Sequence, residues 1–188
     1  PNSTPGCTTK AMTALLDEQP SLVYEAHSTD YQSRAALTAL VANGFPILKV
    51  GPGLTFALRE ALYGLDLIAA EMVPGYGERS LARAMERVML AAPGHWRSHY
   101  HGGETSLYLQ RHYSYSDRIR YYWSNPAASV AVGRLREVLT GVGIPETLMR
   151  QFLPTLPAGL GPASDPEAIL LAAVDAVLAD YEAACRGG

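Results

Sequence analysis

Residues 48–62 read LKVGPGLTFALREAL, and they contain the clearest structural pattern of the chain. They begin inside an apolar run with β-branched residues, 46–50 (PILKV), which Gly-Pro-Gly closes at 51–53. Apolar residues then recur at helical spacing, so the pattern predicts a strand, a tight loop and a helix over 54–72. Together these segments make one β-strand–α-helix unit.

A second unit of the same kind lies just upstream. Residues 22–27 (LVYEAH) again predict a strand, and 28–30 (Ser-Thr-Asp) offer side chains that cap helices, so a helix is predicted over about 31–41. Two such units in succession predict neighbouring parallel strands joined by a helix. Ligands in parallel folds bind where strands pass into helices, here at 26–30 and 50–55.

The rest of the chain predicts helices alone. One helix is predicted before the first strand, over 7–18, and from Glu78 on Pro and Gly residues separate helical patterns. The fold class is therefore α/β, with two strand–helix units in 1–75 and an all-helical part in 76–188. The later predicted helices are 78–91, 95–100, 117–123, 127–139, 146–153 and 166–184, the last one opened by Ser164, Asp165 and Pro166.

Composition fits one globular domain with a sizeable core. The chain has 188 residues, of which 48% are hydrophobic and 18% charged, and its net charge is -3. This small, mixed charge and the lack of a basic run argue against nucleic acid as a partner. No apolar stretch approaches the roughly 20 residues that span a bilayer, so no membrane role is expected. Cys7 and Cys185 alone predict no disulfide framework and fit a reducing cytoplasm.

Two parallel strands are too few to stand alone as a sheet, because parallel sheets are covered on both faces. The chain also opens at Pro1 without a methionine. We therefore expect these residues to be the later part of a longer chain.

Two ionisable side chains stand at the predicted strand ends. His27 is interpreted as a metal ligand, a proton carrier or a polar group satisfied by its neighbours, and the last is favoured. Lys49 would form a Schiff base with a carbonyl substrate if its amine were desolvated; the favoured alternative is a pair with a carboxylate, or phosphate binding as a point charge. These patterns assign neither a catalytic residue nor a metal ligand.

Gly51, Gly53 and Thr55 lie where the second strand passes into its helix. Backbone N–H groups at such places bind phosphate, although Pro52 contributes none. The P-loop spacing of glycine, lysine and hydroxyl residues occurs nowhere in the chain. The loop is therefore a candidate anion site with a pattern of low specificity.

Three histidines raise the question of zinc. His99, His101 and His112 lie close in sequence, but no cysteine or carboxylate completes a ligand set nearby. A surface or loop role is therefore favoured for them.

The stretch 116–123 (SDRIRYYW) is dense in charge and aromatic side chains. Arg118 and Arg120 could reach an anionic group. Aromatic and arginine side chains together also suit packing and subunit interfaces. We therefore predict interface or packing roles for Arg118, Arg120, Tyr122 and Trp123.

Three motifs carry a family resemblance: 23–32 (VYEAHSTDYQ), 47–52 (ILKVGP) with 54–61 (LTFALREA), and 116–123 (SDRIRYYW). In this order they resemble the C-terminal half of the non-catalytic Z subunit of bacterial class II D-tagatose-1,6-bisphosphate aldolase. The same family is also labelled tagatose-6-phosphate kinase. The match runs from about 22 to about 181.

The resemblance implies the C-terminal portion of a TIM (β/α)8 barrel. The two predicted strands would be its strands 7 and 8, and the helices after residue 75 would be a C-terminal extension. It also implies that the loops after these strands occupy phosphate-binding positions. The candidate substrate- or phosphate-binding residues are His27, Ser28, Thr29, Lys49, Gly51, Gly53, Thr55 and Arg59.

The role that the resemblance implies is to support the stability and full activity of a separate catalytic aldolase subunit, in galactitol or N-acetylgalactosamine catabolism. No cofactor is expected on this chain, and zinc is expected on the catalytic partner. A sugar-phosphate kinase remains an alternative that the absent P-loop disfavours. Another alternative is a cryptic class II-like aldolase that uses either Lys49 or a metal held partly by His27. Self-association into a homo-oligomer also stays open.

Overall fold

The computed structural model describes residues 12–157, 160 and 165–186. The chain divides into two compact units: the strand unit, up to Leu54 and again from Val177, and the helical unit, from Thr55 to Ala176. A small parallel sheet within a mostly helical chain agrees with the predicted α/β class. The elements, with η for 3-10 helices, are η1 (Ala14–Glu18), β1 (Glu25–Ala26), α2 (Arg34–Ala42), β2 (Ile47–Leu48), α3 (Gly53–Met72), α4 (Ser80–Ala91), η2 (Pro93–His95), α5 (Glu104–Tyr113), η3 (Arg118–Tyr122), α6 (Pro126–Leu139), α7 (Glu146–Phe152) and α8 (Pro166–Cys185).

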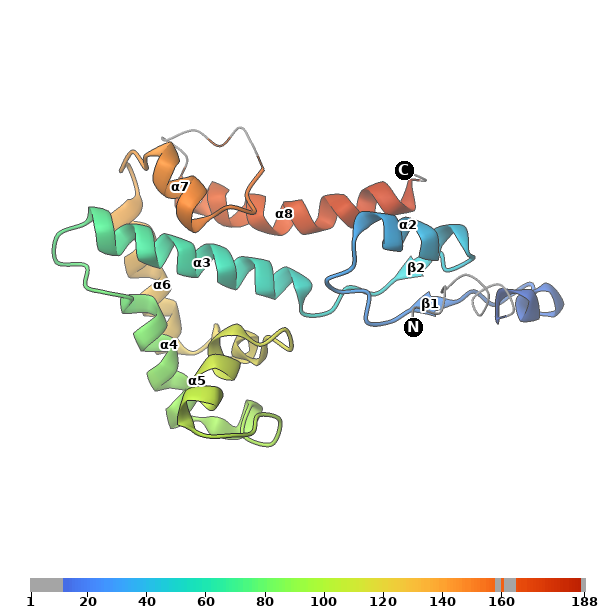
Figure 1. Ribbon diagram of the computed structural model, residues 1–188, viewed down its shortest axis with the longest axis horizontal. Helices are drawn as coiled ribbons and strands as arrows, with labels where there is room; N and C mark the ends of the chain where they lie inside the picture. The colour runs from blue at the N-terminus through green and yellow to red at the C-terminus, as the bar shows by residue number, and fades with distance from the viewer. Residues whose placement is uncertain (1–11, 158–159, 161–164, 187–188) are drawn as a thin grey trace. The chain divides into compact units, whose positions relative to one another are not determined.

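The strand unit contains a two-stranded parallel sheet, β1 beside β2 (Figure 1). Glu25 lies opposite Ile47, and the Lys49 N–H donates to the Ala26 carbonyl over 2.9 Å, one bond beyond the strands. Both strands lie inside the stretches predicted for them and run parallel, as predicted. Each has only two residues, because only these pair with a neighbouring strand in the described part of the chain.

Helix α2 connects the two strands and packs on β2. It begins at Arg34, later than predicted, because the Ser33 side chain caps it by accepting the Ala36 N–H over 3.3 Å. The predicted cap at 28–30 is therefore wrong. Thr29 and Asp30 instead bind the loop after β2.

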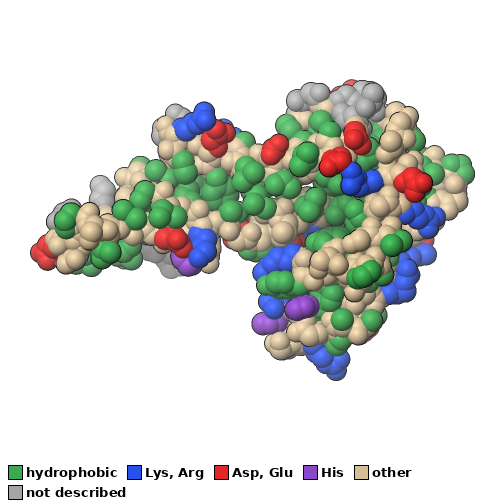
Figure 2. Space-filling model, turned by 180° about the vertical axis from the view of Figure 1, so that it is seen from behind, with side chains coloured by type: hydrophobic (Ala, Val, Ile, Leu, Met, Phe, Trp, Pro, Cys, Tyr) green, Lys and Arg blue, Asp and Glu red, His purple; other side chains and the backbone are tan. Residues whose placement is uncertain are grey.

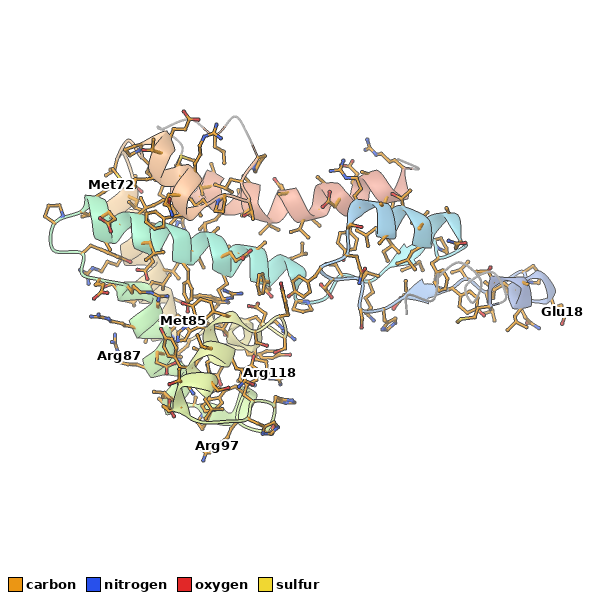
Figure 3. The ribbon with its side chains drawn as sticks, in the orientation of Figure 1. Glu18, Met72, Met85, Arg87, Arg97 and Arg118 are labelled. Carbon is orange, nitrogen blue, oxygen red and sulfur yellow. The ribbon has the colours of Figure 1, made fainter. Side chains whose placement is uncertain are left out.

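The helical unit holds the larger core, in which α4 packs against α6, α5 and η3 (Figure 1). Leu65 and Ile68 of α3 are fully buried there. Met85, labelled in Figure 3, is fully buried on α4, and Leu135 on α6. Large aliphatic side chains from separate helices thus close one core.

A buried carboxylate starts α4. Asp66 lies in α3 and is 1% exposed, yet its carboxylate accepts the N–H groups of Leu81 and Ala82 over 2.9 and 3.1 Å. Tyr76 also donates its hydroxyl to Asp66 over 2.7 Å. Asp66 therefore caps α4 from another helix, which satisfies donors that its own first turn leaves free.

Helix α5 was not predicted. Its buried face is formed by Arg111 and His112 rather than by aliphatic side chains, so the apolar period that indicates a helix is missing. Conversely, the helix predicted over 95–100 is wrong. That segment consists of turns after η2, in which the Trp96 and Arg97 N–H groups both donate to the Pro93 carbonyl.

The helix predicted over 117–123 is instead the 3-10 helix η3. Asp117 stands before it in the left-handed region, with φ 46°, and its side chain makes no cap bond. The carboxylate is engaged elsewhere, and a helix start without its cap is disfavoured. Of 7–18, the described part forms η1, and residues 7–11 lie outside the described residues. The helices predicted over 54–72, 78–91, 127–139, 146–153 and 166–184 are present within a few residues.

Gly64→Ala should destabilise the helical unit, because a Cβ at Gly64 would lie 2.4 Å from Leu153 Cδ2 and 2.5 Å from the Phe152 carbonyl oxygen. Overpacking of this kind costs about 1–3 kcal/mol of unfolding free energy. Gly133→Ala is the matched control, since that helical position has open space around it, and it should stabilise by up to about 1 kcal/mol. Urea unfolding of both variants tests this; equal effects would contradict it.

Candidate functional site

Three ionisable side chains meet at the carboxyl ends of β1 and β2. Glu25 Oε1 lies 2.6 Å from His27 Nε2 and 3.2 Å from Lys49 Nζ. The side chains are 38%, 65% and 58% exposed, in that order. The hydrogen bond from Lys49 is the largest cause that lowers the pKa of Glu25, and the charges of Lys49 and His27 add to it. Glu25 is therefore a carboxylate at neutral pH.

This group, which we call the strand-end cluster, can carry acid–base chemistry. Figure 2 shows a histidine between acidic and basic side chains on the surface of the strand unit. An imidazole can accept and return a proton, and an ammonium stabilises a developing oxyanion. Lys49 is ion-paired and open to solvent, so it lacks the desolvation that would prepare it for a Schiff base.

The predicted anion loop already holds a carboxylate, that of Asp30. The Gly51 N–H donates to both oxygens of Asp30, over 2.9 and 3.1 Å, and the Gly53 N–H donates to Oδ1 over 2.7 Å. A Cβ at Gly51 or Gly53 would come within 2.7 or 2.9 Å of an Asp30 oxygen. The glycines therefore permit this close approach, and the N–H groups of Gly51 and Gly53 are occupied from within the chain.

Thr29 makes a second connection between the strand-end loops. It is 2% exposed, and its hydroxyl donates to the Lys49 carbonyl over 2.9 Å and lies 2.9 Å from the Tyr181 hydroxyl of α8. The flanking residues Ser28 and Tyr31 have φ of 56° and 61°, a left-handed conformation that is strained for side chains of this kind. The loop after β1 is thus held in a defined, costly shape.

Thr55 and Arg59, also in the predicted set, lie in the helical unit. Thr55 donates its hydroxyl to Asp117 Oδ2 over 2.7 Å, and Arg59 Nε donates to Asp117 Oδ1 over 3.0 Å. The Arg59 and Asp117 side chains are 3% and 0% exposed. The Arg59 guanidinium also lies over the Phe56 ring, 4.1 Å from its centroid. Arg59 is therefore engaged in a buried ion pair.

His112 is buried, so the predicted surface or loop role is wrong for it. Its Nδ1 lies 2.5 Å from the Tyr63 hydroxyl and its Nε2 lies 3.0 Å from Glu86 Oε2. Burial lowers the pKa of His112 to about 4. Arg111 binds the same Glu86 carboxylate, over 2.5 and 3.0 Å. His99 and His101 are exposed, as predicted.

The buried neutral His112 should make stability depend on pH. Its folded pKa, about 4, lies below the ordinary 6.5, so the unfolded chain binds more protons between these values. The unfolding free energy should then fall as pH drops from about 6.5 towards 4, at up to about 1.4 kcal/mol per pH unit. Unfolding curves of His112→Gln should show a shallower slope than wild type. The exposed control His101→Gln should keep the wild-type slope, and equal slopes in all three would contradict the assignment.

The aromatic segment 116–123 is packed within the helical unit. Tyr122 is 3% exposed and donates its hydroxyl to the Ala92 carbonyl over 2.6 Å. Arg118 Nε donates to the His95 carbonyl, and Arg120 donates to the Tyr121 hydroxyl over 2.8 Å. These arginines bind neutral oxygen atoms and Tyr121 rather than acids. Trp123 is half-buried and lines an apolar hollow with Leu58, Leu62, Val132 and Leu170.

Sequence reasoning missed Glu25 and Asp30. Glu25 and His27 are two residues apart on an extended segment, a spacing that places side chains on one face, so this signal was present. Asp30 was interpreted as a helix cap. Its contact with Gly51 joins residues 21 apart, and no local pattern indicates it.

Metal and membrane signals are weak in the described ranges. No three histidine, cysteine, aspartate or glutamate side chains gather there as a metal site would require. No helix among those residues combines the length and apolarity that crossing a bilayer demands.

Comparisons place this α/β chain among proteins of tagatose-phosphate metabolism. The family described as D-tagatose-1,6-bisphosphate aldolase subunit GatZ/KbaZ-like matches residues 6–186. The chain therefore belongs to this family, as the sequence motifs predicted.

Two relatives show how names vary for such proteins. A curated protein of Agrobacterium fabrum (strain C58 / ATCC 33970), named D-tagatose 6-phosphate 4-epimerase, is 61% identical over 179 residues. That match covers 95% of this chain and 42% of the relative, so the chain spans less than half of its length. The crystal structure of a probable tagatose 6 phosphate kinase from Sinorhizobium meliloti 1021 superposes with a TM-score of 0.89 and 51% identity, over 98% of this chain and 48% of that one.

Proposed function

We propose that the protein, in its natural full length, interconverts D-tagatose 6-phosphate and D-fructose 6-phosphate by inverting C4. The observation that carries this proposal is the 61% identity, over 95% of the chain, to the relative named D-tagatose 6-phosphate 4-epimerase. The strand-end cluster supports it, because Glu25, His27 and Lys49 supply proton transfer and positive charge at the edge where parallel sheets bind ligands.

The chemistry of C4 dictates the route. C4 is not adjacent to the C2 carbonyl, so its hydrogen is not acidic, and cleavage of the C3–C4 bond inverts C4 without an oxidant and without moving the carbonyl to C3. A base takes the C4 hydroxyl proton, C4 becomes an aldehyde, and the bonding electrons pass to C3 as an enediolate conjugated with C2. Rotation of the aldehyde and re-formation of the bond return the proton and invert C4. An aldolase breaks the same bond of tagatose bisphosphate, so the family description and the relative's name share one chemistry.

Each member of the strand-end cluster has a role in this scheme. His27 takes and returns the hydroxyl proton, and Glu25 orients the ring and stabilises its cationic form. Lys49 stabilises the enediolate oxygen as a positive charge. The reaction is an isomerisation, so it consumes neither ATP nor a redox partner.

We also propose that β1 and β2 are strands 7 and 8 of a TIM barrel, that α3 is the helix following strand 8, and that the helices after residue 75 are the C-terminal extension. Apolar side chains beside the strands support this: Leu22, Val23 and Ile47 are 57%, 63% and 44% exposed. Figure 2 shows further hydrophobic side chains on the surface of the strand unit. Neighbouring strands and helices of a closed barrel would cover such residues.

A second candidate function follows from the family description, which names an aldolase subunit. In this role the protein stabilises a catalytic class II aldolase subunit without turning over substrate itself, and galactitol or N-acetylgalactosamine catabolism would be its setting. Zinc would then belong to the catalytic partner.

One set of assays separates these functions. The purified full-length protein is incubated with D-tagatose 6-phosphate alone, with ATP, or with a catalytic class II aldolase subunit and D-tagatose 1,6-bisphosphate. Formation of D-fructose 6-phosphate without ATP or a second protein supports the epimerase. ATP consumption would indicate the kinase, and activation of the aldolase subunit alone would indicate the supporting role; either result without epimerisation overturns the proposal.

A further inference from the structure

The backbone of Lys49 is held on both sides, by the end of β1 and by the loop after it. Its N–H donates to the Ala26 carbonyl over 2.9 Å, and its carbonyl accepts the Thr29 hydroxyl over 2.9 Å. Two residues further on, the Gly51 N–H donates to the Asp30 carboxylate. The lysine side chain therefore extends from a backbone that β1 and the loop after it hold in place.

We propose that Thr29 and Asp30 are positioning residues that hold Lys49 at its distance from Glu25. This inference rests on the proposed function, because it matters for catalysis only if the strand-end cluster reacts. Both side chains make polar contacts that tie the loop after β1 to its neighbours: Thr29 binds Lys49 and Tyr181, and Asp30 binds Gly51 and Gly53.

The strained backbone of the loop after β1 supports the inference. The two anchors lie between Ser28 and Tyr31, both left-handed, and such strain persists only where surrounding contacts determine the backbone. Two glycines are needed to admit the Asp30 carboxylate, since a Cβ at Gly51 would lie 2.7 Å from Oδ2. The loops are therefore shaped around these two side chains.

Tyr181 extends the anchorage to α8. Its hydroxyl lies 2.9 Å from the Thr29 hydroxyl, and Asp180 beside it binds Arg34 of α2 over 2.7 Å. The end of α8 thus also holds the Thr29 hydroxyl. A chain of contacts runs from α8 through Thr29 to the catalytic lysine.

The test compares four variants of the full-length protein. Asp30→Asn removes the charge with little change of shape, and Gly51→Ala disrupts the same contact from the opposite side. Thr29→Val removes the hydroxyl, and Thr29→Ser restores it. Asp165→Asn is an added control, because Asp165 likewise accepts a backbone N–H, from Glu167 over 3.3 Å, outside this loop pair.

We expect kcat with D-tagatose 6-phosphate to fall about 10–100-fold in Asp30→Asn, Gly51→Ala and Thr29→Val, since small misplacements cost about this much. KM should change little, Thr29→Ser should keep most of the activity, and Asp165→Asn should match wild type. A lower KM in Asp30→Asn would show that Asp30 competes with the substrate phosphate, and unchanged kcat would show no positioning role. Either result overturns the proposal.

Hydrogen exchange of the Gly51 and Gly53 amides, which donate to Asp30, separates this inference from the proposed function. In wild type these amides should be protected, and Asp30→Asn or Gly51→Ala should abolish protection without a large loss of thermal stability. If wild type fails to convert the substrate, the proposed function fails while this exchange pattern still supports the anchoring of Lys49. Unchanged exchange in the variants would overturn the anchoring itself.

Discussion

Replacing Asp117 by alanine should lower the unfolding free energy by about 3–5 kcal/mol, because the change leaves a buried arginine without its anion. Arg59 is 3% exposed and donates to Asp117 over 3.0 Å, and Thr55 donates to the other oxygen over 2.7 Å. Asp117 is also left-handed, with φ 46°, a conformation that aspartate tolerates better than alanine. Urea unfolding measures the change.

The matched variants separate charge from shape. Asp117→Asn keeps the left-handed preference and an acceptor for Thr55 but leaves Arg59 unpaired, so it should still lose much of the stability. Adding Arg59→Met to Asp117→Ala should recover part of the loss, since no buried charge remains. A double variant that is as unstable as the sum of the single ones would contradict this account of the pair.

Replacing Lys49 by methionine should lower kcat with D-tagatose 6-phosphate by about 10²–10³-fold, the typical cost of removing one group that stabilises an oxyanion. Lys49 is also the main cause of the lowered pKa of Glu25. In the variant that pKa should rise. Because Glu25 acts as a carboxylate, activity should then be lost at a higher pH as the solution is acidified.

A surface cation elsewhere gives the control for Lys49. Arg150 pairs with Glu146 over 2.7 Å and both are mostly exposed, so Arg150→Met removes a similar charge from an ordinary surface pair. It should leave kcat and the pH profile unchanged. Full activity of Lys49→Met, or an unmoved acid limb, would remove Lys49 from the mechanism.

Local signals in the sequence predict the framework of the strand unit. The first crossover helix, predicted to end near 41, ends at Ala42, and Asn43 and Gly44 follow it: Gly44 has φ of 93°, and its N–H donates to the Val41 carbonyl over 3.0 Å. Such a stop needs only residues that are adjacent in sequence. The parallel order of β1 and β2 follows in the same way from their spacing and the helix between them.

Contacts between distant residues explain what the sequence could not predict. Helix α5 was not predicted because its buried side is formed by Arg111 and His112. Both side chains bind Glu86, which lies in another helix, α4. The 3-10 helix at 118–122 was predicted as part of a longer helix because the sequence does not show that the Asp117 carboxylate binds Thr55 and Arg59. In each case a charged side chain is buried by a partner far along the chain.

The candidate site was likewise predicted only in part. The ends of strands pointed to His27 and Lys49, and the structure brings both to Glu25. The sequence did not indicate that Asp30 occupies the glycine loop, because this depends on a left-handed turn without glycine. Anion binding by that loop therefore requires Asp30 to move.

The most direct test of the central claim follows D-tagatose 6-phosphate by NMR in the presence of the purified full-length protein, without ATP or any second protein. We expect signals of D-fructose 6-phosphate to appear until the two sugars reach equilibrium, and far more slowly with Lys49→Met. A folded protein that leaves D-tagatose 6-phosphate unchanged, or converts it equally fast without Lys49, would contradict the account.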